Sequence, residues 1–400
     1  MFLVEYPLNS FYKEGIYVGY RYYDSFNVPT AYGFGYGLSY TTFKYSDFEL
    51  SRNNFLPKLE INVTITNTGK VAGKKVVQFF EEKKTGETAM TNFTYEPSKY
   101  VPFQDKAVLE RVRKIRREDI EKHPNPDYRI RVVPDADLSI IMLFDAFHRI
   151  KTAADNNEPI VMIMPNPWPM FRMLAHMLNK FRVDCRKLFT FNMDEYADQD
   201  GNIAPETWEY GFGHAFKKYF YNNLDKEIRP PEKQIHTFTN ENINDYGEMI
   251  SDLGEADIVY SGPGWTGHLA FIEPDAPEFR AESMEEWMQM GPRICTLSPF
   301  TLAQNSLHGS FGMSGDLAMV PPKAATIGPA QVVRAKNRIQ LFGITVHGTT
   351  TSWQRLIARL VMHGEPTPLV PESVHQLLRT DAYVTETIAM NIEPDWEKGY

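Results

Sequence analysis

The chain has 400 residues, a formal net charge of −9 at pH 7, and ordinary globular shares of charged and hydrophobic residues. This length predicts two or more units with a sizeable core. The acidic balance argues against non-specific nucleic-acid binding, and no apolar run reaches the length of a membrane span. Cys185 and Cys295 show no metal-ligand spacing and predict reduced core residues. With no signal-peptide pattern at the N-terminus, the sequence predicts a cytoplasmic protein.

Residues 1–80 are rich in tyrosine, phenylalanine and glycine and carry β-type patterns. Within Ile61–Phe80, alternating apolar residues predict a half-buried strand, the Asn67–Gly69 turn follows it, and Val76–Phe80 begins another strand. The segment resembles the end of family 3 glycoside hydrolases, where the catalytic part runs into a fibronectin-III-like sandwich. The resemblance stops near Phe80, which leaves an incomplete all-β segment, because a sandwich needs two sheets. The nucleophile of that family lies upstream, so the resemblance implies a remnant or accessory module without glycosidase activity.

Residues 81–104 are polar and turn-rich and predict a linker. Lys106–Lys122 follows as a helix with one apolar stripe formed by Val108, Val112, Ile115 and Ile120. Its basic residues alternate with acidic ones, which favours a solvated face over a phosphate or nucleic-acid site. The prolines in His123–Pro126 end the helix.

From residue 128 onward, strand and helix patterns alternate. The expected strands are Arg129–Val133, Pro159–Met164, Lys187–Met193, Gln234–Phe238, Ala256–Tyr260, Ala324–Ile327, Ile339–Val346 and Tyr383–Ile388. The expected helices are Asp137–Ala154 (with Asp137 as N-cap), Trp168–Phe181, Glu206–Leu224, Asn244–Leu253 and Ser352–His363. This alternation predicts an α/β domain over residues 105–400, a doubly wound parallel sheet flanked by helices.

The most informative stretch is Glu255–Pro274, in which a buried strand runs into a loop containing Gly264 and Gly267, then His268 and Glu273. Glycines allow a tight turn and a close approach of the backbone to a ligand. In open α/β sheets ligands bind beyond the carboxyl ends of the strands, where this loop would lie. The spacing alone leaves two interpretations open: a ligand-binding loop, or a buried turn whose histidine satisfies a backbone carbonyl.

The stretch SGPGWTGHLAFIEP resembles the signature loop of the glucosamine-6-phosphate deaminase/isomerase family. A second stretch, FTFNMDEY (Phe189–Tyr196), resembles that family's other hallmark, and the similarity extends over about residues 158–390. Members open a sugar ring, move a proton between C2 and C1, and expel or add ammonia. The resemblance implies three catalytic residues: Asp194 moves the proton, His268 opens the ring, and Glu273 orients the imidazole.

Further residues are candidates for contacting a substrate: Glu195, Gly264, Thr266, Gly267, Gly348 and Thr349. Glu195 neighbours Asp194 in the motif, and if the strand pleat continues the two side chains point to opposite faces, so that one of them meets the substrate. The Gly348–Thr351 stretch offers N–H and hydroxyl donors at a helix start. The remaining histidines show no metal-ligand spacing, and the sequence predicts neither a metal nor another cofactor.

Several positions depart from the family pattern. Thr266 stands where the family has an acidic residue, which leaves the ring-opening relay incomplete. Pro165–Pro169 (PNPWP) replaces a glycine-rich phosphate loop, and prolines offer no N–H to an anion. Leu302 and Thr351 align with the family's cationic phosphate anchors.

These losses predict a divergent deaminase/isomerase-like enzyme with a degraded phosphate site, acting on a small-molecule sugar or aminosugar. The alternative is a non-catalytic sugar-binding or regulatory module with the same fold. No nucleic-acid or membrane partner is expected. Family members commonly form multimers, so the resemblance also suggests a homo-oligomer.

Overall fold

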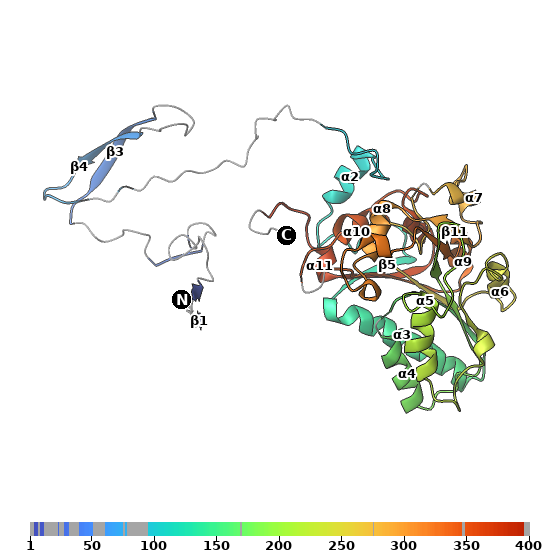
Figure 1. Ribbon diagram of the computed structural model, residues 1–400. Coiled ribbons are helices and arrows are strands. Elements are labelled where there is room, and N and C mark those ends of the chain that lie inside the picture. The colour runs from blue at the N-terminus through green and yellow to red at the C-terminus, as the bar shows by residue number, and fades with distance from the viewer. Residues whose placement is uncertain are drawn as a thin grey trace. The chain divides into compact units, whose positions relative to one another are not determined.

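The structure is a computed structural model that describes residues 4–6, 9–11, 23, 28–31, 40–50, 61–74, 77 and 95–395, except 169, 275 and 346–348. The chain divides into two compact units, Met1–Tyr95 and Glu96–Tyr400 (Figure 1). The boundary falls inside the stretch predicted as a linker.

Two antiparallel ribbons make up the described strands of the first unit. β1 (Val4–Tyr6) pairs with β2 (Asn9–Phe11), and β3 (Phe43–Leu50) pairs with β4 (Ile61–Asn67). At the start of β4 half-buried and exposed residues alternate, as the sequence predicts. The strand predicted at Val76–Phe80 lies outside the described residues, apart from Val77.

A seven-stranded sheet, parallel throughout, forms the centre of the second unit, in the order β5-β14-β13-β10-β6-β7-β9. The strands are β5 (Tyr128–Val133), β6 (Ile160–Met164), β7 (Leu188–Asn192), β9 (Ile235–His236), β10 (Ile258–Ser261), β13 (Arg338–Phe342) and β14 (Thr380–Thr385). This sheet confirms the predicted α/β doubly wound class.

Helices cover both faces of the sheet, because its central strands are apolar on both sides. In β6, Ile160, Met162 and Met164 join one core cluster and the intervening Val161 and Ile163 join another. The first cluster also contains residues of three helices that Figure 1 shows grouped on one side of the sheet: α3 (Leu138–Asp155), α4 (Phe171–Lys180) and α5 (Phe212–Tyr219). The second contains residues of α6 (Tyr246–Ser251) and α9 (Pro329–Arg334).

A third cluster joins the beginning and the end of this unit. Its helices are α2 (Lys106–Arg113), α10 (Gln354–His363) and α11 (Glu386–Ala389), which pack with β5 and β14. Arg359 of α10 is wholly buried here. Its guanidinium donates to the backbone carbonyls of Ile115, Ala389 and Met390 at 2.9, 2.9 and 3.0 Å, so one side chain links segments that are far apart in the sequence.

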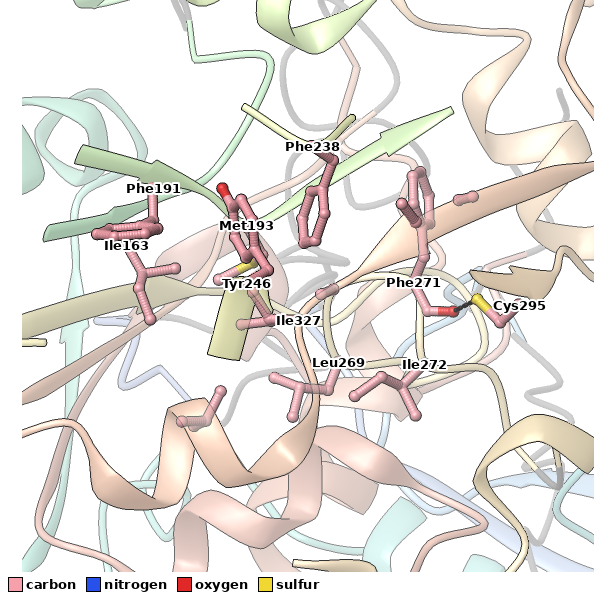
Figure 2. Close-up of a cluster of buried hydrophobic side chains, with 14 of the residues drawn as sticks. Ile163, Phe191, Met193, Phe238, Tyr246, Leu269, Phe271, Ile272, Cys295 and Ile327 are labelled. Carbon is pink, nitrogen blue, oxygen red and sulfur yellow. Dashed lines mark hydrogen bonds between the residues drawn. The ribbon is translucent and has the colours of Figure 1, made fainter. Parts of the chain in front are cut away.

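A small antiparallel sheet packs into the second core cluster and corrects one expectation. It has the order β11-β12-β8 and consists of β11 (Arg293–Thr296), β12 (Lys323–Thr326) and β8 (Asp194–Ala197). Of residues 324–327, expected with the parallel strands, 324–326 therefore belong to this second sheet and Ile327 follows it. Figure 2 shows its Cys295 beside Phe271, whose carbonyl accepts the thiol hydrogen bond.

Other boundaries differ where tertiary contacts compete with helix propensity. The helix predicted over Glu206–Leu224 is confined to α5, because Gly211 is its N-cap and Glu206 is engaged by Thr237 and Lys217. α2 ends at Arg113, and Ile115 then gives its carbonyl to Arg359. Asp137 does occupy the N-cap of α3, but without a side-chain hydrogen bond. The strand predicted at Tyr383–Ile388 ends at Thr385, where α11 takes over.

Two short helices that the sequence did not predict are α7 (Met284–Trp287) and α8 (Pro299–Asn305). Both cysteines are free and buried, as expected. Among the described residues, no helix is both long and apolar enough to cross a bilayer.

Candidate functional site

The sheet order brings the two sequence motifs to one edge. β6 lies between β10 and β7, and the carboxyl ends of parallel strands meet on the same side. Because neighbouring strands are about 4.8 Å apart, the ends of β7 and β10 are separated by about 10 Å. Asp194 follows β7 and His268 follows β10. Thr326, the register partner of Asp194, also accepts a hydrogen bond from the N–H of Phe271 at 3.1 Å, which ties the histidine loop to β8.

Glycines shape the loop after β10 by making room for protein groups. A Cβ on Gly264 would lie 1.9 Å from Nε2 of His268, so any side chain there would displace the imidazole. Gly267 has φ of +83°, a left-handed conformation that other residues rarely adopt. A Cβ on Gly262 would lie 2.4 Å from the carbonyl oxygen of Leu341. The close approach at Gly264 therefore accommodates the histidine itself, whereas the sequence predicts an approach to a ligand.

His268 is held by two threonine hydroxyls. Its Nδ1 lies 3.2 Å from Oγ1 of Thr266 and 3.0 Å from Oγ1 of Thr301, and the residue is 4% exposed. Thr266 donates its own proton to Oε2 of Glu273 at 3.1 Å, so its oxygen remains free to accept from Nδ1–H. This pattern places a proton on Nδ1. Nε2 is the ring nitrogen that takes no part in these bonds. Among the described residues, no backbone carbonyl accepts a hydrogen bond from this imidazole.

Glu273 is the carboxylate beside this imidazole. Its Oε2 lies 3.8 Å from Nδ1 of His268, and its Oε1 accepts from the N–H of Ser298 at 2.9 Å. Burial acts to raise the pKa of Glu273, but His268, the Thr301 hydroxyl and the Ser298 N–H outweigh it and hold the pKa below its ordinary value. A buried negative charge therefore faces the histidine at neutral pH.

Asp194 is the first residue of β8 and is 7% exposed. Within the described part of the chain, its Oδ1 has no hydrogen-bond partner. Burial, with a smaller contribution from the neighbouring charge of Glu195, raises the pKa of Asp194 well above its ordinary value. Asn192, at the end of β7, is fully buried, and both atoms of its amide also lack a partner among the described residues. Unpaired buried polar groups are costly, so this pair is a candidate for ligand contact.

Glu195 is engaged in a different way from its neighbour. Its carboxylate accepts from the N–H groups of Tyr196 and Phe212 at 2.9 and 3.0 Å and from that of Gly213 at 2.6 Å. It therefore caps the N-terminus of α5. These bonds lower the pKa of Glu195, but burial has the larger effect and raises it to about 7. Asp194 and Glu195 therefore have different surroundings, and which of them meets a substrate stays a prediction. Because Glu195 is fully engaged by backbone groups, we propose that it positions the strand rather than contacting a ligand.

Replacing Glu195 by Ala is expected to lower the free energy of unfolding by about 2 kcal/mol, because three buried N–H groups lose their acceptor. Urea denaturation followed by circular dichroism measures this loss. Glu209→Ala, which removes an exposed carboxylate in the same segment, is the matched control and should leave stability within about 0.5 kcal/mol of the wild type. Equal midpoints for the two variants would contradict the capping role.

The positions expected to hold a phosphate carry no cationic side chain. Trp168 is buried and packs edge-to-face on Phe171, with ring centroids 5.2 Å apart, at the start of α4. Leu302 packs against the second core cluster, and Thr351 is exposed. Thr349 is exposed and its hydroxyl accepts from the N–H of Thr351 at 3.1 Å, whereas Gly348 lies outside the described residues.

Two contributors from α8 escaped the sequence reasoning. Thr301 supports His268, and Ser298, the N-cap of α8, gives its N–H to Glu273. Ser298-Pro299 is a recognisable helix start, with a capping hydroxyl followed by proline at the first helical position. This signal predicts the helix, but not that its first turn lies against the histidine.

A buried polar network is hydrogen-bonded to the glycine loop. Ser261, which precedes the loop, lies 2.9 Å from Nε2 of His375, and Glu372 lies 3.3 Å from the same nitrogen. The N–H of Glu372 donates to the carbonyl of Gly267 at 3.1 Å. Burial raises the pKa of Glu372 to about 8 and lowers the pKa of His375 to about 3, so both groups are mainly neutral at pH 7. Neither residue was singled out from the sequence as part of the site.

Across the described residues, no group of three or more histidine, cysteine, aspartate or glutamate side chains is arranged to hold a metal ion. What the site offers instead is an imidazole beside a carboxylate, with an unpaired buried carboxyl group at the same sheet edge. This arrangement suits proton transfer.

The second unit has the fold of sugar-phosphate deaminases. A solved monomeric glucosamine-6-phosphate deaminase superimposes with a TM-score of 0.52 at 17% identity, covering 65% of this chain and 98% of that one. The glucosamine-6-phosphate deaminase of Mannheimia succiniciproducens is 29% identical over 216 residues, and that of Dictyostelium discoideum 26% over 215. Each match covers 52% of this chain and 72% of the relative. Over about half of its length the chain is thus a homologue of the glucosamine-6-phosphate deaminases, as the motifs predicted.

A shorter stretch of the chain has different relatives. Thermostable beta-glucosidase B of Acetivibrio thermocellus is 46% identical over 71 residues, and a beta-glucosidase of Bacteroides ovatus 45% over 82. These matches cover 17% and 19% of this chain. They agree with the predicted glycoside-hydrolase resemblance of residues 1–80. The chain spans only 9% and 11% of those two proteins. No protein-family model matches the chain.

Proposed function

We propose that the second unit binds an aminosugar and converts it to a ketose with release of ammonia. The observation that carries this proposal is the buried His268, which is held on Nδ1 by Thr266 and Thr301 beside the carboxylate of Glu273. The homology to deaminases supplies the reaction class. In balance, the aminosugar and one water yield the ketose and ammonia.

Each residue then has one task. With Nδ1 oriented by the threonines, Nε2 of His268 is the nitrogen that donates a proton to the sugar ring oxygen and opens the ring. Glu273 stabilises the imidazolium that donates this proton. Asp194 moves the proton between C2 and C1, and a desolvated carboxylate with a raised pKa is a stronger base than an exposed one. Glu195 fixes the start of α5 and the strand that carries Asp194.

The preferred substrate is proposed to lack a phosphate. Trp168, Leu302 and Thr351, at the positions where the family has phosphate donors, contribute no positive charge. Each charge-assisted bond to a phosphate contributes about 1.5–3 kcal/mol, so the loss of several weakens binding by orders of magnitude. A hexosamine without a phosphate loses no binding free energy through these replacements.

A second function is favoured by Thr266. Its hydroxyl keeps the hydrogen bonds that hold His268 and Glu273 together, yet it does not take up a proton near neutral pH. A protein that conserves this geometry without the proton carrier suits sugar binding without turnover. Sensing or regulation by an aminosugar is therefore the alternative.

Ammonia release separates these two functions. We expect the wild type to release ammonia from glucosamine and from glucosamine 6-phosphate slowly, and Thr266→Asp to accelerate release at least tenfold by restoring a proton carrier. Thr207→Asp, which adds the same charge at an exposed threonine, is the control and should not change the rate. Tight sugar binding with no ammonia from either protein would favour the sensing function.

Ligand stabilisation tests the phosphate site separately. Glucosamine and glucosamine 6-phosphate are expected to raise the thermal midpoint by nearly equal amounts, because a phosphate finds no cationic partner and adds little affinity. Equimolar series of both ligands, with inorganic phosphate as the control, measure this in the full chain. A phosphate-dependent gain of many degrees, or rapid turnover of the phosphorylated sugar, would contradict the proposed loss of the phosphate site.

A further inference from the structure

A cavity of about 360 Å³ opens beside the histidine loop. This volume falls within the range of small-molecule sites. One part of the lining comes from residues 101–103 and from Leu109 and Arg113 of α2, and another part comes from Leu356, Ile357 and Leu360 of α10. Trp265, Thr266, Phe300 and Trp353 complete the lining. The wall from residues 101–113 lies before the part of the sequence that resembles the deaminases.

The lining is aromatic on the side of the histidine loop. The rings of Trp265 and Trp353 stack with centroids 5.5 Å apart and planes inclined by 26°, and Phe300 meets Trp265 at 6.0 Å. Trp265 is 37% exposed. Indole faces partly open to solvent bind flat apolar rings by stacking. Because almost every other lining residue is aliphatic or aromatic, the cavity lacks the convergent hydrogen-bonding groups that a sugar needs.

Among the described residues that line the cavity, Arg113 is the one that carries a charge. It lies in the last turn of α2 and is exposed. Within the described residues it forms no ion pair, although the nearby Glu110, which pairs with Lys114 at 2.7 Å, is also affected by its charge. An unpaired guanidinium at the rim of an apolar cavity is suited to a carboxylate, which it binds through two parallel hydrogen bonds.

We propose that this cavity binds a small aromatic carboxylate, with the ring against Trp265 and Trp353 and the carboxylate on Arg113. A ligand in the cavity lies next to the candidate site, because Thr266 lines the cavity. The hydroxyl of Thr266 donates to Glu273 and lies beside Nδ1 of His268. The cavity is thus a second ligand site next to the histidine loop. This assignment stands on the lining residues alone and does not depend on aminosugar turnover.

Calorimetric titration of the full chain tests the assignment with three probes that share one ring system: 2-naphthylacetate, 2-naphthylacetamide and 2-naphthyl phosphate. The acetate is expected to bind about tenfold more tightly than the uncharged amide, because only the acetate forms charge-assisted bonds. Arg113→Gln should abolish this preference. Lys99→Gln, which removes an exposed positive charge that does not line the cavity and leaves the Glu110–Lys114 pair in place, should keep it.

A further variant tests the aromatic wall. Trp353→Leu is expected to weaken the binding of both 2-naphthylacetate and 2-naphthylacetamide by about tenfold. The preference for the acetate should remain. Failure of 2-naphthylacetate to bind the wild type, or equal affinities for acetate and amide, would overturn the proposal. So would an unchanged preference in Arg113→Gln, or 2-naphthyl phosphate binding more than about tenfold tighter than the acetate. Thermal midpoints of all variants confirm that they are folded.

Discussion

Replacing Asp194 by Asn is expected to lower the rate of ammonia release from glucosamine by about 10²–10⁴-fold, the usual contribution of a general base. Asparagine has the same shape as aspartate and does not accept a proton, so the variant isolates the chemistry from the packing of β8. Because burial already raises the pKa of Asp194, the amide also relieves the cost of a buried charge. The thermal midpoint should therefore be unchanged or higher.

Asp200→Asn is the matched control, because Asp200 is exposed in the same stretch of chain and should keep the wild-type rate. If wild-type turnover is too slow to measure, the comparison is made in the Thr266→Asp background. A rate within about threefold of the parent for Asp194→Asn, in a folded variant, would remove Asp194 from the proposed chemistry.

The second large effect concerns the pH dependence of stability. Burial raises the pKa of Glu372 to about 8, well above the value of an unfolded glutamate. The folded state therefore holds a proton that the unfolded chain releases. This contribution to stability is complete below pH 4.5 and is lost as the pH rises through 8, amounting to a loss on the order of 3 kcal/mol. Glu195, whose pKa is raised to about 7, acts in the same direction.

Glu372→Gln should remove most of this loss, because the amide oxygen accepts the bonds from Gln340 and Ser261 without ionising. Unfolding free energies from urea titrations at pH 5 and pH 8 measure the effect. We expect the variant to be clearly more stable than the wild type at pH 8 and close to it at pH 5. Glu365→Gln, at an exposed position nearby, should follow the wild-type curve. Parallel curves for wild type and Glu372→Gln would show that Glu372 is ionised in the folded protein.

The sequence was most informative about the parallel sheet. β6 is buried along its whole length, and its uninterrupted apolar residues made it recognisable. The small antiparallel sheet was less visible, because β8 and β11 are four residues each and their pairing is decided by distant partners. Helix lengths were overestimated where the chain leaves the helix early, as after Arg113, beyond which the Ile115 carbonyl accepts from Arg359.

For the site, the sequence located the two motifs but not the long-range contacts. Asp194 and Glu195 differ in their partners, and the backbone at Gly264 lies close to His268, whereas the sequence predicts a close approach to a ligand. Thr301 and Glu372 lie 33 and 104 residues from His268 in the chain, and no local pattern connects them to it. Only folding brings these partners together.

Arg359 has a practical consequence for dissecting the protein. Its guanidinium holds carbonyls that lie 275 positions apart in the chain, at Ile115 and Met390. A fragment trimmed to the deaminase-like stretch, beginning at residue 158, would leave this cation without part of its acceptors. Expression of the isolated unit should therefore begin upstream of α2 and continue past Met390, and shorter versions are expected to be insoluble.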